Sequence, residues 1–274
     1  MLTASGGSFF YNFPAYPYIL PLNLTSFPFT PTSSDLILTR IHLAVTRRAK
    51  SYPKRFSCEI YCKLCAAFNP VFFNADEWVQ LAKDAGMEYM VVTSKHHDGF
   101  ALFHSKVSKY NVVDATPFGR DVIGELANAC AKKGLRLGLY YSQDLDWSEP
   151  NGGGYTAGHT WCGFGPWTNE WDFPDNAKKN YTQCFEDKIV PQVEEILTNY
   201  GELALIWFDT PQTLSEAQSR HLYDMVRKLQ PECLVNSRIG NGLGDYRSLG
   251  DNEIPESGLA EGLVESACTL RKQR

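Results

Sequence analysis

Between about residues 74 and 239, segments typical of helices alternate with short apolar segments typical of buried strands. The expected strands cover 89–93, 135–142, 204–207 and 233–239. Strands that alternate with helices require crossover connections, which place the strands parallel to one another in a single sheet. We therefore expect an α/β fold, and the length of 274 residues suits a (β/α) TIM-like barrel.

The expected helices have recognisable ends. Asn74, Asp121 and Ser215 stand where side chains cap a first turn, and Gly86, Gly134 and Pro231 stand where helices stop. A longer helix is expected over 176–200, where apolar residues recur at helical spacing. Pro191 lies inside that segment and should kink the helix or divide it in two.

Residues 1–57 differ from the rest of the chain. They are rich in proline and aromatic residues, with no helical or alternating period, and proline interrupts every apolar run. We interpret this region as an irregular segment or as sequence foreign to the domain, and residues 58–274 as a partial (β/α) barrel domain. Residues 1–57 lack the basic start and continuous apolar core of a signal peptide, and none of their apolar runs is long enough to cross a membrane.

Composition excludes some classes of partner. A net charge of −5 gives no basic surface for nucleic acid, and no Lys/Arg block suggests a membrane surface. Cys62 and Cys65 form one C-x-x-C pair, but no second pair completes a zinc set, so we expect no metal. Cys130 is expected to be a small buried hydrophobe. No glycine-rich phosphate loop occurs.

Polar and aromatic side chains follow the expected strands at the point where each one ends. They are His96 and His97 at the end of the first strand, Tyr141 at the end of the second, Trp207 and Asp209 at the end of the third, and Arg238 at the end of the fourth. Each has an ordinary structural explanation by itself, such as a turn, a core position or a surface ion pair. Because the carboxyl ends of parallel strands face one cleft, their joint occurrence favours a functional site.

The chemistry of such a cleft can be narrowed from its residue types. A hydrolytic metal site needs more ligands than two adjacent histidines, and no G-x-S-x-G elbow for a serine nucleophile occurs. A carboxylate remains, in an aromatic cleft rich in hydrogen-bond donors, with further carboxylates soon after it in the chain. This arrangement suits glycoside hydrolysis, in which one carboxylate attacks the anomeric carbon and another protonates the leaving oxygen.

The segments KHHDGF, LGLYYSQDLDW, LIWFDTP and NSRIGNGLGDY together resemble the catalytic barrel of the α-L-fucosidases, glycoside hydrolase family 29. The resemblance covers roughly residues 68–266. It implies a retaining hydrolase that removes terminal α-L-fucose from glycans, glycoproteins or glycolipids, with no metal or organic cofactor. By this resemblance Asp209 is the nucleophile. The residues that hold the sugar are then His96, His97, Tyr141, Trp207 and Arg238.

The acid/base is not fixed by one motif in the family, and it lies after the strand that carries Arg238. We expect it to be Glu253, with Asp251 and Glu256 as close competitors and Glu265 as a weaker one. The resemblance also implies a secreted, lysosomal or periplasmic protein. It leaves the linkage and the oligomeric state undetermined.

The chain departs from the family pattern at both ends. Family members carry a fucose-contacting histidine on their first barrel strand, for which His42 in RIHLAV is the candidate here. The family also continues beyond the last residues of this chain, so we expect an incomplete barrel. Two alternatives therefore stay open beside hydrolysis, an inactive fucose-binding fragment and a purely structural one.

Overall fold

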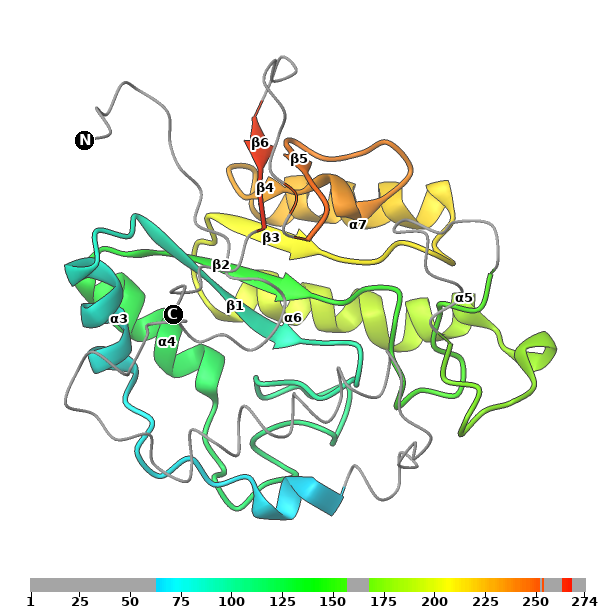
Figure 1. Cartoon of the computed structure of the whole chain (residues 1–274), viewed down its shortest axis with the longest axis horizontal. Coiled ribbons are helices and arrows are strands. Elements are labelled where there is room, and N and C mark those ends of the chain that lie inside the picture. The colour runs from blue at the N-terminus through cyan, green and yellow to red at the C-terminus, as the bar shows by residue number, and fades with distance from the viewer. Residues whose placement is uncertain (1–62, 157–167, 252, 254–262, 268–274) are drawn as a thin grey trace.

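The computed structural model describes residues 63–156, 168–251, 253 and 263–267. At its centre lies a four-stranded sheet in the order β1-β2-β3-β4, with every neighbouring pair parallel. The strands are β1 (Tyr89–Lys95), β2 (Arg136–Tyr141), β3 (Leu205–Phe208) and β4 (Leu234–Val235). Strand order follows chain order, as it does around a (β/α) barrel, and the strands fan across the middle of Figure 1.

Helices connect the strands as the sequence predicts. The helices are α3 (Ala75–Asp84), α4 (Val122–Lys133), α5 (Tyr181–Cys184), α6 (Val190–Asn199) and α7 (Glu216–Leu229). Short 3₁₀ segments lie at η1 (Leu64–Ala67), η2 (Asn176–Lys178) and η4 (Ser237–Ile239). The side chains of Asn74, Asp121 and Ser215 accept hydrogen bonds from the first turns of α3, α4 and α7, so all three predicted caps are confirmed.

The expected helix over 176–200 is interrupted. A π-helical turn, η3 (Phe185–Ile189), separates α5 from α6, and Pro191 lies in the first turn of α6. Proline lacks the N–H that would continue a regular helix through this point, so the predicted division is confirmed.

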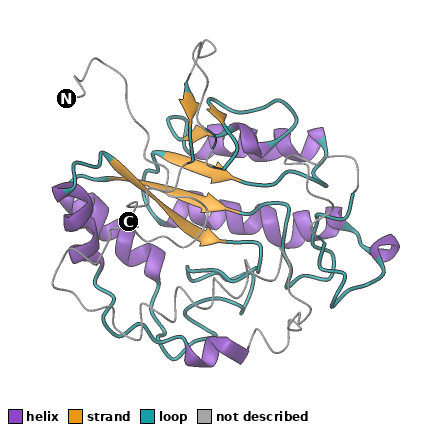
Figure 2. Ribbon diagram, viewed as in Figure 1, coloured by secondary structure: helices purple, strands orange, loops and turns teal. Residues whose placement is uncertain are grey.

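The two faces of the sheet have different neighbours. The larger core cluster joins residues from α3, α4, α6 and α7 to alternate strand residues such as Val92, Leu139 and Ile206. The smaller cluster is formed almost entirely by strand residues, namely Tyr89, Val91, Tyr140, Leu205 and Trp207. The helices therefore cover one face, as Figure 2 shows, and the other face is the inner face of a barrel-type sheet.

A second, two-stranded parallel sheet pairs β5 (Arg247–Ser248) with β6 (Val264–Glu265). An isolated bridge between Asn236 and Tyr246 joins the segment before β5 to the end of β4. This small sheet brings Glu265 to the inner face of β3, where its carboxylate accepts a hydrogen bond from Trp207 Nε1 at 2.7 Å.

The expected strand over 233–239 is shorter than predicted. The β4 ladder ends at Val235, because the side chain of Asn236 bonds both the backbone N–H and the carbonyl of Phe208, each at 2.9 Å. These side-chain bonds replace the ladder, and the chain turns into η4, which carries Arg238. The segment 1–57, including His42, lies outside the described residues. Among the described helices, none has the length and apolarity needed to span a bilayer.

Candidate active site

Asp209 follows β3 directly and is only 4% exposed. Its Oδ2 accepts a hydrogen bond from the Tyr140 hydroxyl at 2.8 Å, and its Oδ1 pairs with Arg238 Nη1 at 3.0 Å. His97 Nε2 lies 3.8 Å from Oδ2. A buried carboxylate is costly unless it is paired, and here both oxygens have donors that fix its orientation.

The backbone around Asp209 is held as firmly as its side chain. Its N–H donates to Gln143 Oε1 at 2.7 Å, and Gln143 Nε2 donates to the carbonyl of Arg238 at 3.0 Å. Asp144 Oδ2 accepts three backbone N–H groups of the next segment, from residues 212 to 214, at 2.6–2.9 Å. Thr210 has a φ of 49°, in the left-handed region that non-glycine residues rarely adopt. Strain of this kind persists where the surroundings fix the chain, as they do here.

An aromatic wall stands beside Asp209 on the inner face of the sheet. Tyr140 stacks on Trp207 with ring centroids 5.2 Å apart, and on His96 at 5.4 Å. The rings of His96 and His97 lie 4.0 Å apart. Burial and the neighbouring Asp209 raise the pKa of Tyr140 well above its usual value, so its phenol keeps its proton and donates to the carboxylate.

Tyr141, which the sequence placed in the site, lies on the opposite face of the sheet. Its hydroxyl donates to Gln192 Oε1 at 2.9 Å, and its ring belongs to the core cluster under the helices. Successive side chains of a strand point to opposite faces, so only one of the two adjacent tyrosines can face Asp209. Tyr140 is that residue.

Arg238 connects two carboxylates. Its Nη1 bonds Asp209, and its Nη2 bonds Asp251 Oδ1 at 3.0 Å and the Leu249 carbonyl at 2.7 Å. Its guanidinium also lies 4.5 Å from the Trp207 ring centre. Burial works against the cation, but the two carboxylates outweigh it and raise the pKa of Arg238. Asp209 and Asp251 therefore lie close to each other, because they bind neighbouring nitrogens of the same Arg238 guanidinium.

The other acid/base candidates have different surroundings. Glu253 is exposed, and its Oε2 accepts from the Gly250 N–H at 2.7 Å. Glu265 is 2% exposed, and burial raises its pKa to about 7 although Trp207 Nε1 donates to it. Glu256 lies outside the described residues.

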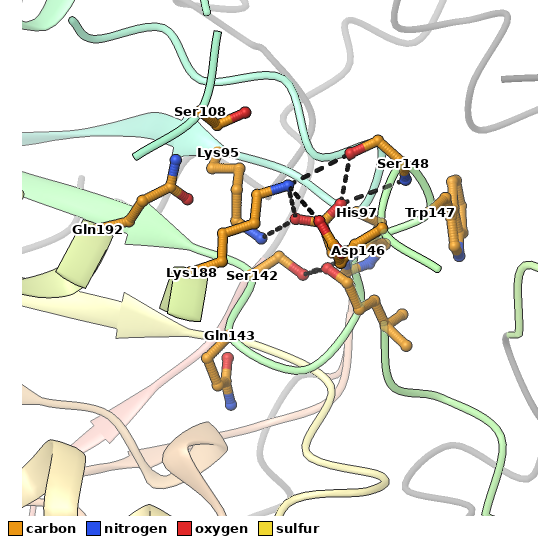
Figure 3. Close-up of polar contacts among 12 residues, drawn as sticks. Lys95, His97, Ser108, Ser142, Gln143, Asp146, Trp147, Ser148, Lys188 and Gln192 are labelled. Atoms are coloured by element: carbon orange, nitrogen blue, oxygen red, sulfur yellow. Dashed lines mark hydrogen bonds and ion pairs between the residues drawn. The ribbon is translucent and has the colours of Figure 1, made fainter. Parts of the chain in front are cut away.

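A buried charge network lies next to His97 (Figure 3). Asp146 Oδ2 pairs with Lys95 Nζ at 3.1 Å and with Lys188 Nζ at 2.9 Å, and Asp146 Oδ1 accepts from Ser148 Oγ at 2.7 Å. Burial raises the pKa of Asp146, but the two lysines outweigh it and keep that pKa below its usual value. The next residue, Trp147, donates its N–H to the His97 carbonyl at 2.6 Å, which joins the network to the site.

The structure thus brings four of the predicted residues, His96, His97, Trp207 and Arg238, together around the carboxylate of Asp209. The residues that position them were missed by sequence reasoning, namely Lys95, Tyr140, Ser142, Gln143, Asp144 and Asp146. Strand parity was a usable signal for Tyr140, because Leu137 and Leu139 already mark the helix-facing side of β2.

Comparison with known proteins agrees with this geometry. The sequence model of the Alpha-L-fucosidase family matches residues 29–272. The chain belongs to this family. Tissue alpha-L-fucosidase of Mus musculus is 41% identical over 220 residues, and Alpha-L-fucosidase 1 of Arabidopsis thaliana is 32% identical over 201 residues.

Solved α-L-fucosidases share the fold. Unliganded AlfC from Lactobacillus casei is 56% identical with a TM-score of 0.70, over 76% of this chain and 68% of that one. An AlfC variant in complex with a 4-nitrophenyl α-L-fucopyranoside substrate is 55% identical, also with a TM-score of 0.70, over 77% of this chain and 68% of that one. The parallel sheet with helices is therefore part of the (β/α)-barrel fold of this family.

The matches cover unequal shares of the proteins compared. They include 76% of this chain but 43% of the mouse relative, and 70% of this chain but 32% of the Arabidopsis relative. The chain thus spans about a third to two fifths of the length of these curated relatives.

Proposed function

We propose that this chain carries the catalytic centre of a retaining α-L-fucosidase, which hydrolyses terminal α-L-fucose from glycans, glycoproteins or glycolipids. The observation that carries the proposal is Asp209, a buried carboxylate at the end of a barrel strand with both oxygens held by donors. The membership of the chain in the Alpha-L-fucosidase family and its likeness to an AlfC variant solved in complex with a fucoside support the same reaction.

In this proposal Asp209 attacks the anomeric carbon and forms a covalent glycosyl-enzyme, which water then hydrolyses. Tyr140 and Arg238 hold the carboxylate so that one oxygen faces the sugar, and positioning of this kind lowers the barrier to attack. His96 and His97 bind sugar hydroxyls, and Trp207 gives an apolar surface for the C–H face. The proposed chemistry uses no cofactor. The absence of a metal ion from the site stays a prediction.

For the acid/base, the contacts favour Asp251 over the sequence-based choice of Glu253. Asp251 shares the Arg238 guanidinium with Asp209, and retaining pairs need their carboxyl groups about 5–5.5 Å apart. Half of its side chain is exposed, at 51%, so a leaving group can reach it. Glu265 has the raised pKa expected of a proton donor, but it is buried and bonded to Trp207 Nε1.

The reaction is tested by incubating the purified chain with 4-nitrophenyl α-L-fucoside and measuring release of 4-nitrophenol. A mechanism-based fluorinated fucoside should then label the peptide that contains Asp209. Asp209→Asn should lower kcat at least about 10³-fold, as loss of a nucleophile does, with Asp224→Asn at an exposed position of α7 as the control. A label on another residue would reject the nucleophile, and absence of hydrolysis in the unchanged chain would reject the function.

The acid/base is tested with Asp251→Asn, Glu253→Gln and Glu265→Gln. We expect Asp251→Asn to lower kcat/KM about 10²- to 10⁴-fold on a fucosyl disaccharide, since general-acid catalysis contributes this much. The loss should be smaller on 4-nitrophenyl fucoside, whose leaving group needs little protonation. If Glu253→Gln shows this substrate dependence and Asp251→Asn does not, the original choice of Glu253 is right.

The partner in this proposal is a fucosylated oligosaccharide or glycoconjugate. A secreted, lysosomal or periplasmic site of action is part of the proposal, because such substrates are abundant there. Fractionation of the source cells, followed by assay of each fraction for fucoside hydrolysis, would test that location.

A further inference from the structure

Ser142 is the first residue after β2 and is fully buried between two partners. Its Oγ donates a hydrogen bond to the carbonyl of Leu145 at 2.8 Å, and the same Oγ lies 2.8 Å from His97 Nδ1 (Figure 3). Its own N–H donates to the Lys95 carbonyl at 3.0 Å, which ties the serine to the end of β1. The hydroxyl therefore has a fixed position between a carbonyl and an imidazole.

Only one placement of protons satisfies the Ser142 hydroxyl, the Leu145 carbonyl and His97 Nδ1 together. A carbonyl oxygen can only accept, so the single Ser142 proton is used on Leu145. The contact with His97 can then be a hydrogen bond only if Nδ1 carries a proton and donates it to Oγ. If Nδ1 carried no proton, one of the two contacts of Ser142 Oγ, with Nδ1 or with the Leu145 carbonyl, would join two buried acceptors with no proton between them. Such a contact is unfavourable.

We infer that Ser142 is a positioning residue that holds His97 as the Nδ1–H tautomer, so that Nε2 is an unprotonated acceptor on the Asp209 side of the ring. Nε2 lies 3.8 Å from Asp209 Oδ2, and neither atom can donate to the other in this state. A ligand group that donates a hydrogen bond is the complement of these two acceptors. The inference deepens the proposed function and rests on it for the ligand, which is then a sugar hydroxyl that donates to Nε2.

The surroundings of His97 favour the neutral ring that this tautomer requires. The side chain is 5% exposed, and burial together with the charge of Lys95 lowers its pKa to about 3. Packing fixes the ring plane, because His96 lies 4.0 Å away and Trp147 meets it edge-on at 5.6 Å. Packing cannot choose between the two tautomers, which have the same shape, so the choice falls to the hydrogen bond with Ser142.

A fixed acceptor gives a specific chemical preference. A hydroxyl can donate to Nε2, whereas fluorine at the same carbon can only accept. A fucoside with that hydroxyl replaced by fluorine would place two acceptors together and bind poorly. If His97 instead presented an N–H, the fluorine would keep part of the interaction.

The first test is spectroscopic and needs no sugar. Nitrogen-15 spectra of the histidine-labelled full chain, assigned by comparison with His97→Gln, distinguish a protonated Nδ1 from a protonated Nε2. We expect protonated Nδ1 in the unchanged chain, and a shift toward protonated Nε2 in Ser142→Ala. Ser94→Ala is the matched control, because it removes another buried serine hydroxyl, one that donates to the carbonyl of Tyr140. Protonated Nε2 in the unchanged chain would overturn the inference, as would an unchanged tautomer in Ser142→Ala.

The second test is kinetic and uses 4-nitrophenyl fucosides with single hydroxyls replaced by fluorine. Ser142→Ala should lower kcat/KM on the parent fucoside about 10- to 100-fold, while Ser142→Thr retains most of it. One fluorinated position should be penalised in the unchanged chain and less so in Ser142→Ala. An equal penalty in both would overturn the role in substrate binding. If the unchanged chain hydrolyses no fucoside but shows the expected tautomer, the proposed function fails and the proton assignment stands.

Discussion

The two sides of the candidate site are built differently. At the ends of β1 and β2, His97 lies in front of Lys95 and Asp146, and their side chains are between 0% and 5% exposed. At the ends of β3 and β4, Arg238 is buried, but its partner Asp251 is 51% exposed. The first side is fixed by buried charges and the second reaches solvent. This division suits the proposed hydrolase, in which the rigid side would hold the sugar and the open side would admit variable leaving groups.

The buried side owes its rigidity to an arrangement that is costly to disturb. Asp146 is a carboxylate shared by two lysines, and Lys188 also lies 3.6 Å from Glu149, so loss of the Lys95 ammonium leaves one ammonium for two carboxylates in a low-dielectric interior. The open side depends on one guanidinium, and an exposed carboxylate there can rehydrate if the pair breaks. Substitutions on the two sides should therefore differ in their effects on folding.

The largest expected effect comes from Lys95→Met, which keeps the aliphatic volume but removes the buried ammonium. We expect the free energy of unfolding to fall by about 3–5 kcal/mol, the usual result of breaking a buried ion pair. Urea denaturation monitored by circular dichroism measures it. Arg136→Met is the control, since its ion pair with Glu88 is exposed at both ends, and it should change stability by no more than about 1 kcal/mol. Equal effects of the two substitutions would contradict the distinction between buried and exposed ion pairs.

The second prediction concerns the pH dependence of folding stability that arises from Glu265, the hydrogen-bond partner of Trp207. Burial raises its pKa from an ordinary 4.5 to about 7, so the folded state favours the protonated acid. Its contribution to stability is fully present below about pH 4.5 and is lost as the pH rises through about 7. The loss amounts to about 3 kcal/mol.

Glu265→Gln keeps an acceptor for Trp207 Nε1 and removes this titration. Relative to the unchanged chain, it should become more stable as the pH rises from about 5 to 8. Thermal melts of both proteins across that range measure the difference, with Glu253→Gln at an exposed position as the control. Parallel pH profiles for Glu265→Gln and the unchanged chain would show that the carboxyl is ionised in the folded state.

Sequence reasoning succeeded where local physics decides. The helix caps, the parallel order of the strands and the carboxylate after β3 follow from residue types and spacing along the chain. It failed where partners are distant in sequence. Gln143 bonds the backbones of Asp209 and Arg238, and the two small strands that carry Glu265 to Trp207 have no signal of their own.

The tyrosine pair shows a different kind of failure, one in which the signal was present. Tyr140 and Tyr141 are chemically identical neighbours on β2, and only the alternation of the strand assigns one to the site and one to the core. The resemblance to the family identified the segment but not the parity, which the alternation of Leu137 and Leu139 along β2 indicates. In the register of β2 against β3, Tyr140 lies opposite Trp207.

The two phenylalanine substitutions give the smallest and sharpest test, because each removes one hydroxyl. Tyr140→Phe removes the donor to Asp209, so kcat on 4-nitrophenyl fucoside should fall about 10-fold or more, as loss of about 1.5–3 kcal/mol from a hydrogen bond to a charged group predicts. Tyr141→Phe removes the donor to Gln192, so it should cost about 1 kcal/mol of folding stability with kcat nearly unchanged. A loss of activity in Tyr141→Phe with none in Tyr140→Phe would mean that β2 presents its other face to the substrate.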